Sequence, residues 1–262
     1  MNLEDSVRKW LEDQGYPLEM KVAEALRNAD VAWDHGRVYD DPATGKVREI
    51  DVMGYLDYWG SPRFSIHLII ECKHAREKPW VLFCTERSML TPAGHVLSLP
   101  ATKKAKKIMD IMATSEAVQK MTLFRRPDLV GFNFARAHTD NQDAAFHAIR
   151  GVTAAAVSVA ARIGKWKHNI LYVPIVVVDS PLMKCSLPAD TNDLLLQEVQ
   201  EGTLLYNPGG KSGRVSVHIM HINAFPAFLK TIKKEGMELY NDIRLKVNEH
   251  DAEQSYTDGT ER

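Results

Sequence analysis

The chain has 262 residues, of which 45% are hydrophobic and 26% are charged, a composition typical of a folded globular protein and not of a disordered one. Lys and Arg number 33 and Asp and Glu 34, so the formal net charge is -1 and the chain as a whole is not a polycation. Any surface that binds nucleic acid must therefore be local. The three cysteines form no Cys-x-x-Cys pair, and we expect them to be reduced.

Nothing in the sequence indicates a membrane or export. The apolar stretch 170–178 is far shorter than the ~20 residues of a membrane span. The N-terminus lacks the apolar core of a secretory signal and carries early acidic residues. We therefore expect a cytoplasmic protein with no membrane association.

The first third of the chain predicts two helices and a β-hairpin. Apolar residues at helical spacing favour a helix over 3–14 behind the N-cap Asn2, and a second over 17–28. Residues 47–59 are rich in β-branched and aromatic side chains, and 63–73 alternate strictly. The three residues between them, Gly-Ser-Pro, are typical of a hairpin turn.

The remaining chain mixes both kinds of element. The patterns predict helices over 79–90, 102–121, 142–163 and 225–247, and strands over 128–135, 170–178, 203–207 and 214–222. The last two strands flank the loop PGGKSG as a second hairpin. Since no linker or composition break divides the chain, we expect a single domain over 1–250, with a layered α/β arrangement and a flexible tail over 251–262.

Acidic residues meet on the first hairpin. Alternation places Glu71 and Lys73 on one face of their strand. Counting back from the three-residue turn places Asp51 opposite Glu71, and Glu49 opposite Lys73. Opposed Cβ atoms are only ~5 Å apart, so two carboxylates there destabilise the sheet unless a cation compensates. Mg²⁺ prefers such oxygen ligands and usually takes one or two carboxylates.

At these residues the sequence resembles a known family. REIDV, followed after about twenty residues by IIECK, resembles the PD-(D/E)XK nuclease superfamily, whose type members are restriction endonucleases. Asp51, Glu71 and Lys73 match its motif, although Ile50 stands where the nominal signature has proline. The resemblance covers about residues 16–75.

The run GYPLEMKVAEAL resembles the opening helix of the Mrr-like and Holliday-junction-resolvase-like branches of this superfamily. That helix commonly supplies a glutamate to the site. The resemblance makes Glu19 the candidate and leaves Glu24 as the alternative.

The resemblance implies a restriction-endonuclease-like three-layer αβα fold, with a central mixed sheet, a catalytic core over about 16–135, and extra C-terminal strands and helices. It implies that Asp51, Glu71, the backbone carbonyl of Cys72 and Glu19 hold Mg²⁺ or Mn²⁺, and that Lys73 orients the attacking water. The implied activity is metal-dependent endonucleolytic hydrolysis of DNA in bacterial restriction or anti-phage defence. The implied partners are DNA and a second copy of the chain or other defence-system subunits.

Five basic residues are candidates for contacts with the DNA backbone. Arg76 and Lys78 follow the strand that carries the motif, and Lys103, Lys104 and Lys107 lie on one predicted helix. A solvated helix face explains the helical lysines equally well.

Three other interpretations remain. The chain could keep the nuclease fold as a non-catalytic nucleic-acid-binding or assembly subunit of a larger bacterial complex. It could be an unrelated α/β enzyme acting on a small phosphorylated substrate, although it has no glycine-rich nucleotide fingerprint. The motif could also be an ordinary salt-bridged ladder, although the apolar run 66–70 predicts a strand buried on both faces.

Overall fold

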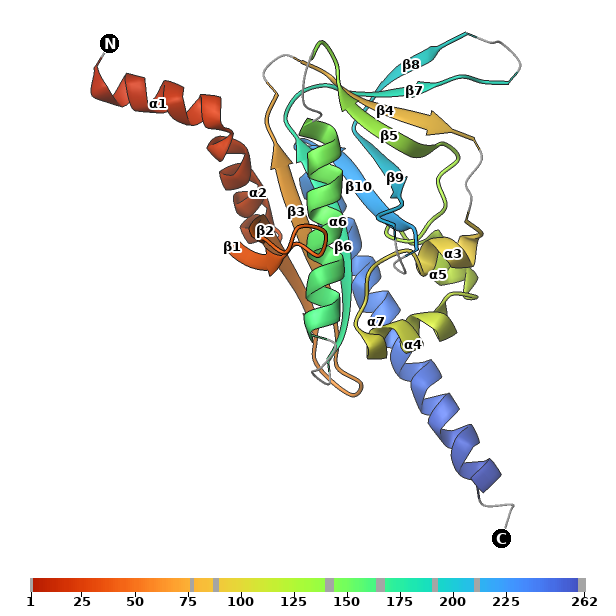
Figure 1. The fold of residues 1–262 in the computed structure, drawn as a ribbon. Helices are drawn as coiled ribbons and strands as arrows, with labels where there is room; N and C mark the ends of the chain where they lie inside the picture. The colour runs from red at the N-terminus through yellow and green to blue at the C-terminus, as the bar shows by residue number, and fades with distance from the viewer. Residues whose placement is uncertain are drawn as a thin grey trace.

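The computed structural model describes residues 2–75, 78–86, 90–139, 144–163, 168–189, 193–209 and 213–258. In this part of the chain the strands form one mixed sheet with the order β1-β2-β3-β6-β10-β9-β5-β4-β7-β8 (Figure 1). The strands are β1 (Ala32–Asp40), β2 (Val47–Tyr58), β3 (Phe64–Lys73), β4 (Trp80–Thr85), β5 (Val130–Arg136), β6 (Asn169–Val178), β7 (Leu182–Ser186), β8 (Leu195–Val199), β9 (Glu201–Tyr206) and β10 (Val215–His221). The helices are α1 (Leu3–Gln14), α2 (Tyr16–Asn28), α3 (Pro92–Val96), α4 (Lys103–Met112), α5 (Glu116–Lys120), α6 (Ala144–Ile163) and α7 (Phe225–Asp258).

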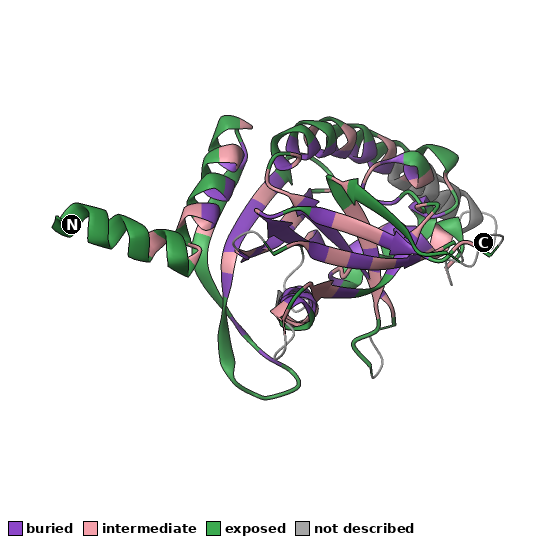
Figure 2. Ribbon diagram, turned by 90° about the horizontal axis from the view of Figure 1, so that it is seen from above, coloured by how far each residue is buried: buried purple, intermediate pink, exposed green. Residues whose placement is uncertain are grey.

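Helices cover both faces of the sheet. One hydrophobic core cluster joins α2, α4 and α7 to side chains such as Leu68 and Ile70 of β3, and a second joins α6 to Ile69 between them. This alternation is the period-two pattern of a strand buried on both faces. Figure 2 shows the buried residues in the strands and on the helix faces that turn toward them. The protein is therefore a mixed α/β protein with helical layers around a large mixed sheet, as its sequence predicts.

The two N-terminal helices begin and end close to the predicted positions. The side chain of Asn2 accepts a hydrogen bond from the backbone N–H of Asp5 (2.8 Å), and Gly15 ends α1 with a left-handed φ of 82°. Leu18, Val22 and Leu26 of α2 are buried against the sheet. By contrast, α1 buries none of its residues and projects from the body in Figure 1.

The first hairpin forms in the predicted register. β2 and β3 pair antiparallel from Tyr58 opposite Phe64 to Val52 opposite Ile70, which is the pairing that the three-residue turn requires. Their outer neighbour β1 was not predicted from the sequence, and it pairs antiparallel with β2. On the inner side, β3 pairs in parallel with the buried strand β6. The second predicted hairpin is also confirmed, because β9 and β10 pair antiparallel.

The predicted helix over 79–90 is wrong, because Trp80–Thr85 forms strand β4. Trp80, Leu82 and Cys84 are buried while the residues between them are half-exposed. This is the period of a strand, and a short apolar run cannot be assigned from composition alone. β4 pairs with β5 on one side and with β7 on the other.

Three other helices differ from their predicted bounds. The predicted helix 102–121 is divided into α4 and α5, since Ala113 to Ser115 leave the helix between them. The last helix, α7, continues past the predicted end at residue 247 to Asp258, into the segment expected to be a flexible tail. α6 begins at Ala144, and its predicted cap, Asp140 or Asn141, lies outside the described residues.

α6 is a core helix. Its stretch Ala144–Arg162 is apolar and long enough to cross a membrane by length and composition, with a mean hydropathy of 1.4, and it is longer than the apolar stretch considered in the sequence. Half of this stretch is nevertheless buried inside the protein. Ala148, Val152 and Ala156 belong to the core cluster that α6 forms with the sheet.

Candidate active site

The candidate site lies where the β2–β3 ladder ends. The last pair of the ladder is Val52 with Ile70, so Asp51 and Glu71 are the next residues on the two strands. Beyond this point β3 continues beside β6, where Glu71 lies opposite Val176 and Lys73 opposite Val178. The end of this ladder therefore brings Asp51 and Glu71 together, with Lys73 two residues further along β3.

At the end of this ladder, the side chain of Asp51 serves as the hydrogen-bond acceptor for the backbone of β3. The backbone N–H of Cys72 donates a hydrogen bond to Oδ2 of Asp51 (2.7 Å). The N–H and C=O of one strand residue point to the same neighbouring strand, so the carbonyl of Cys72 is also directed toward β2. The carbonyl expected to bind the metal thus faces the side on which Asp51 lies.

Glu71 and Lys73 form an ion pair on one face of β3. The distance between Nζ of Lys73 and Oε1 of Glu71 is 2.6 Å, and only 28% and 18% of the two side chains are exposed. Burial and the charge of Asp51 raise the pKa of Glu71 to about 7. Burial is the largest single influence on the pKa of Lys73 and lowers it, but the charge of Glu71, the hydrogen bond to Glu71 and the charge of Asp51 together raise the pKa overall, so the amine stays protonated.

The pKa of Asp51 is raised as well, mainly by burial, although the hydrogen bond from Cys72 opposes this shift. Because burial is the largest cause of both raised pKa values, ionising these carboxylates costs the folded protein free energy. A bound cation would remove that cost. Lys73 alone does not remove this cost, because the pKa of Glu71 is raised even with the amine of Lys73 in contact with it.

Glu19 approaches the same cluster from α2. A Cβ placed on Gly15 would lie 3.1 Å from Cβ of His74, so the start of α2 packs against the residue that follows β3. Burial and the charge of Asp51 raise the pKa of Glu19. The alternative, Glu24, pairs with Arg27 on the exposed side of α2 (3.1 Å). The structure therefore places Glu19, and not Glu24, beside the motif.

A pocket of about 490 Å³ opens in front of Glu71 and Lys73. Tyr39, Asp41, Arg48, Glu49, His147, Arg150 and Gly151 complete its lining. The hydroxyl of Tyr39 donates to the carbonyl of Gly151 (3.2 Å), which fixes α6 to β1 at the pocket wall. Asp51 is not part of this lining, so it contacts the backbone of β3 beside the pocket and not its open volume.

Two arginines line this pocket beside a buried aspartate. Nε of Arg48 lies 2.8 Å from Oδ2 of the buried Asp41, and Arg150 lies 4.0 Å from the same oxygen. Burial opposes ionisation of Asp41, but the hydrogen bonds from Ala43, Thr44 and Arg48 lower its pKa overall. One carboxylate thus holds two guanidinium groups at the pocket, where an anionic substrate could meet them. Sequence reasoning missed these residues because they are distant along the chain and match no motif.

The donor set fits a hard divalent cation, with one restriction. Two carboxylates and a backbone carbonyl are oxygen ligands of the kind that Mg²⁺ and Mn²⁺ bind. Within the described parts of the chain, however, no three Asp, Glu, His or Cys side chains converge closely enough to hold one metal ion. Glu19 therefore does not join Asp51 and Glu71 as a third side-chain ligand in this arrangement.

Two histidines near the motif were also missed from the sequence. Nδ1 of His35 on β1 lies 3.0 Å from the backbone carbonyl of Asp51. Nδ1 of His74 lies 2.5 Å from Oδ2 of Asp179, the residue that follows β6. Nε2 of His74 is buried without a hydrogen-bond partner. The first contact joins β1 to β2 at Asp51, and the second joins the residues that follow β3 and β6. No motif spacing would have indicated either contact.

The basic residues expected to contact DNA are not gathered at this site. Lys78 donates a hydrogen bond to the carbonyl of His138 (2.9 Å), and Arg76 lies outside the described residues. Lys103, Lys104 and Lys107 are exposed on α4. α4 begins where Thr102 bonds to Ile170 at the start of β6, whereas Lys73 lies beside Val178, roughly 26 Å along the strand. The lysines of α4 therefore lie toward the opposite end of β6 from Lys73.

Comparison of this chain with protein-family models, with curated proteins and with solved structures finds no match.

Proposed function

We propose that this protein is a metal-dependent endonuclease that hydrolyses DNA phosphodiester bonds, built on a restriction-endonuclease-like αβα core. The observation that carries the proposal is the convergence of Asp51, Glu71 and Lys73 at the end of the β2–β3 ladder, where burial raises the pKa of both carboxylates. This convergence supports the motif resemblance, because it brings together the three residues that match the motif. Restriction or anti-phage defence in a bacterial cytoplasm is the setting that the resemblance favours.

The proposed role of each residue follows from its position in the site. Asp51, Glu71 and the carbonyl of Cys72 would hold Mg²⁺ or Mn²⁺, which when bound polarises a phosphate and makes water more acidic. Lys73 keeps its proton, so its ammonium can donate a hydrogen bond and offset negative charge on a phosphate in the pocket. Glu19 adds negative charge at the edge of the site and can orient water there.

The two arginines of this pocket would position the DNA backbone. Arg48 and Arg150, both held by Asp41, face the same volume as Lys73. Guanidinium groups suit phosphate oxygens because they offer several donors in a fixed plane. A DNA strand in this pocket would lie between these arginines and the motif residues.

Nicking of supercoiled plasmid tests the proposal. With Mg²⁺ or Mn²⁺ the wild type should convert supercoiled to open-circular plasmid, and a chelator should stop it. Lys73→Ala should lower the rate by at least about a hundredfold, as loss of one electrostatic group does in comparable sites. Lys120→Ala is the matched control, since Lys120 pairs with Glu116 on the exposed surface of α5 (3.2 Å). A wild type that retards DNA but cuts none would instead establish a binding or assembly subunit.

A further inference from the structure

A second pocket lies where the sheet divides. β10 pairs with β6 only from His218 opposite Ile175 onward. Before that point the segment 98–102 lies between the two strands. The N–H of Tyr172 donates to the carbonyl of Pro100 (2.8 Å), and the N–H of Ser216 donates to the carbonyl of Ser98 (3.3 Å). The connection cannot fill the space of a full strand, so a hollow of about 580 Å³ remains between it, α4 and α6.

This pocket is separate from the candidate active site. Both are lined by α6, but the second pocket uses Val157, Ala160 and Ala161, whereas the first uses His147 and Gly151. Gly151 and Ala161 are ten residues apart, which is about 15 Å along a helix axis.

The floor of the second pocket is aliphatic. Its apolar lining residues are Val96, Leu97, Leu99, Pro100, Ala101, Met109, Val157, Ala160, Ala161 and Val215. The hydroxyl of Ser98 is already used, because it donates to the carbonyl of His95 (2.6 Å) and lies 2.6 Å from Oγ of Ser216. No aromatic ring lines the described pocket, so it offers no stacking surface for a nucleobase. An aliphatic or compact apolar body suits it better.

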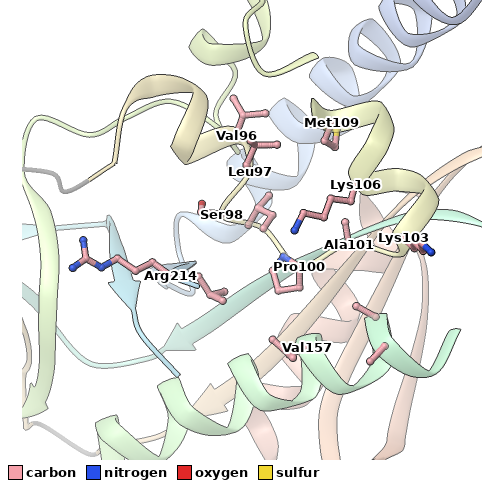
Figure 3. A pocket seen from close by; sticks show the side chains of 14 residues that line it. Val96, Leu97, Ser98, Pro100, Ala101, Lys103, Lys106, Met109, Val157 and Arg214 are labelled. Carbon is pink, nitrogen blue, oxygen red and sulfur yellow. The ribbon is translucent and has the colours of Figure 1, made fainter. Parts of the chain in front are cut away.

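The rim of this pocket is cationic. Lys103, Lys106 and Arg214 belong to the lining, which includes no Asp or Glu among the described residues. Figure 3 shows the Lys106 side chain extending from α4 toward Ser98 and Pro100, over the hollow, while Lys103 and Arg214 lie to either side. In the part of the chain that the structure describes, these three side chains make no ion pair. The positive charge of Lys106 is thus available to a ligand.

We propose that this pocket binds a small amphipathic organic anion, with its apolar body on the aliphatic floor and its carboxylate at the ammonium of Lys106. The volume lies within the range of pockets that take small ligands, which are mostly apolar with a few charged groups that set orientation. The proposal does not depend on nuclease activity, because the two pockets share no residue.

Calorimetric titration of the full chain with octanoate tests this site, with 1-octanol as the probe that keeps the chain length and lacks the charge. Octanoate should bind at one site, and 1-octanol should bind about tenfold more weakly or not at all. Lys106→Gln should weaken octanoate binding by about tenfold, and Lys106→Arg should largely retain it. Lys104→Gln is the matched control, because Lys104 lies on the same helix outside the lining, and it should bind octanoate as the wild type does.

A second variant tests whether the aliphatic floor of this pocket holds the ligand. Val157 is half-buried and lines the hollow, so Val157→Trp should fill it and abolish octanoate binding while the thermal unfolding midpoint stays within a few degrees of wild type. Loss of binding in both Val157→Trp and Lys106→Gln, with retention in Lys104→Gln, supports the site. Absence of octanoate binding to the wild type, or equal binding by wild type and Lys106→Gln, overturns it.

Discussion

Nζ of Lys73 lies 2.6 Å from Oε1 of Glu71, two residues earlier on the same face of β3. The pair lines a pocket that Arg48 and Arg150 also line. A phosphate in that pocket would therefore meet the cations Lys73, Arg48 and Arg150 together with the buried carboxylate of Glu71. A bound cation would stabilise the ionised form of Glu71, because burial and the charge of Asp51 raise the pKa of this carboxylate to about 7.

The raised pKa of Glu71 predicts that stability without divalent ions falls as the pH rises. The folded protein holds this proton more tightly than the unfolded chain, whose Glu has a pKa of 4.5. The stabilisation of the folded state by this bound proton is therefore complete below pH 4.5 and is lost as the pH rises through about 7. The shift corresponds to at most about 3 kcal/mol. Asp51 and Glu19, whose pKa values are also raised, act in the same direction.

Urea unfolding in a chelating buffer between pH 5 and 8 measures this effect. Glu71→Gln, which keeps the shape and removes the titration, should show a flatter pH profile than wild type over that window. Addition of Mg²⁺ above pH 7 should restore stability to the wild type and not to Glu71→Gln. A wild-type profile that is flat or rises across the window would contradict the electrostatic account of the site.

Glu19 should matter to the site and Glu24 should not. Glu19 lies close enough to Asp51 for its pKa to be raised by that charge, whereas Glu24 pairs with Arg27 on the solvent side. We expect Glu19→Gln to lower the rate of metal-dependent plasmid nicking by about tenfold or more. Glu24→Gln should nick at the wild-type rate. Equal losses in the two variants would show that α2 acts only through its packing.

Gly151 should tolerate alanine and reject larger side chains. A Cβ on Gly151 would lie 3.9 Å from Oε2 of Glu71 and 4.0 Å from the hydroxyl of Tyr39, which are ordinary contacts. Since alanine favours a helix interior, Gly151→Ala should raise the free energy of unfolding by about 0.5 to 1 kcal/mol and keep activity. Gly151→Leu should fold but obstruct the pocket and lower nicking by at least about tenfold. Full activity in Gly151→Leu would show that DNA does not use this pocket.

The lysines of α4 should contribute to DNA affinity only on long duplexes. They lie roughly 26 Å from Lys73 along β6, which is about eight base pairs of B-DNA. Charge removal at Lys103, Lys104 and Lys107 together should weaken binding to a 30-base-pair duplex and lower its salt dependence. The same variant should leave binding to a six-base-pair duplex unchanged. An unchanged salt slope on the long duplex would assign these lysines to a solvated helix face.

The sequence predicted the elements whose form depends on residues that are close along the chain. The first hairpin has strict alternation and a short turn, and these two features fix the register that places Asp51 beside Glu71. The caps Asn2 and Gly15 likewise fix the ends of α1. The failure at 79–90 has the opposite cause, because β4 is a six-residue strand whose pairing partners, β5 and β7, are remote in sequence.

The candidate site was predictable where its residues lie on one predicted hairpin or match the family that the sequence resembles. Glu71 and Lys73 follow from the alternation of one strand, and Glu19 from the resemblance of its helix. Arg48 and Arg150 could not be predicted, because both depend on Asp41, which a turn presents between β1 and β2. The end of the β2–β3 ladder, which frees Asp51 to accept from Cys72, is a tertiary feature with no signal in the sequence.

The central claim is that one divalent cation binds between Asp51 and Glu71, and a crystal soaked with Mn²⁺ tests it most directly. The anomalous difference map should show one strong peak within bonding distance of a carboxylate oxygen of Asp51, a carboxylate oxygen of Glu71 and the carbonyl oxygen of Cys72. The same soak of Asp51→Asn should lose that peak. An absence of density there in the wild type, with Mn²⁺ bound elsewhere or nowhere, would contradict the account.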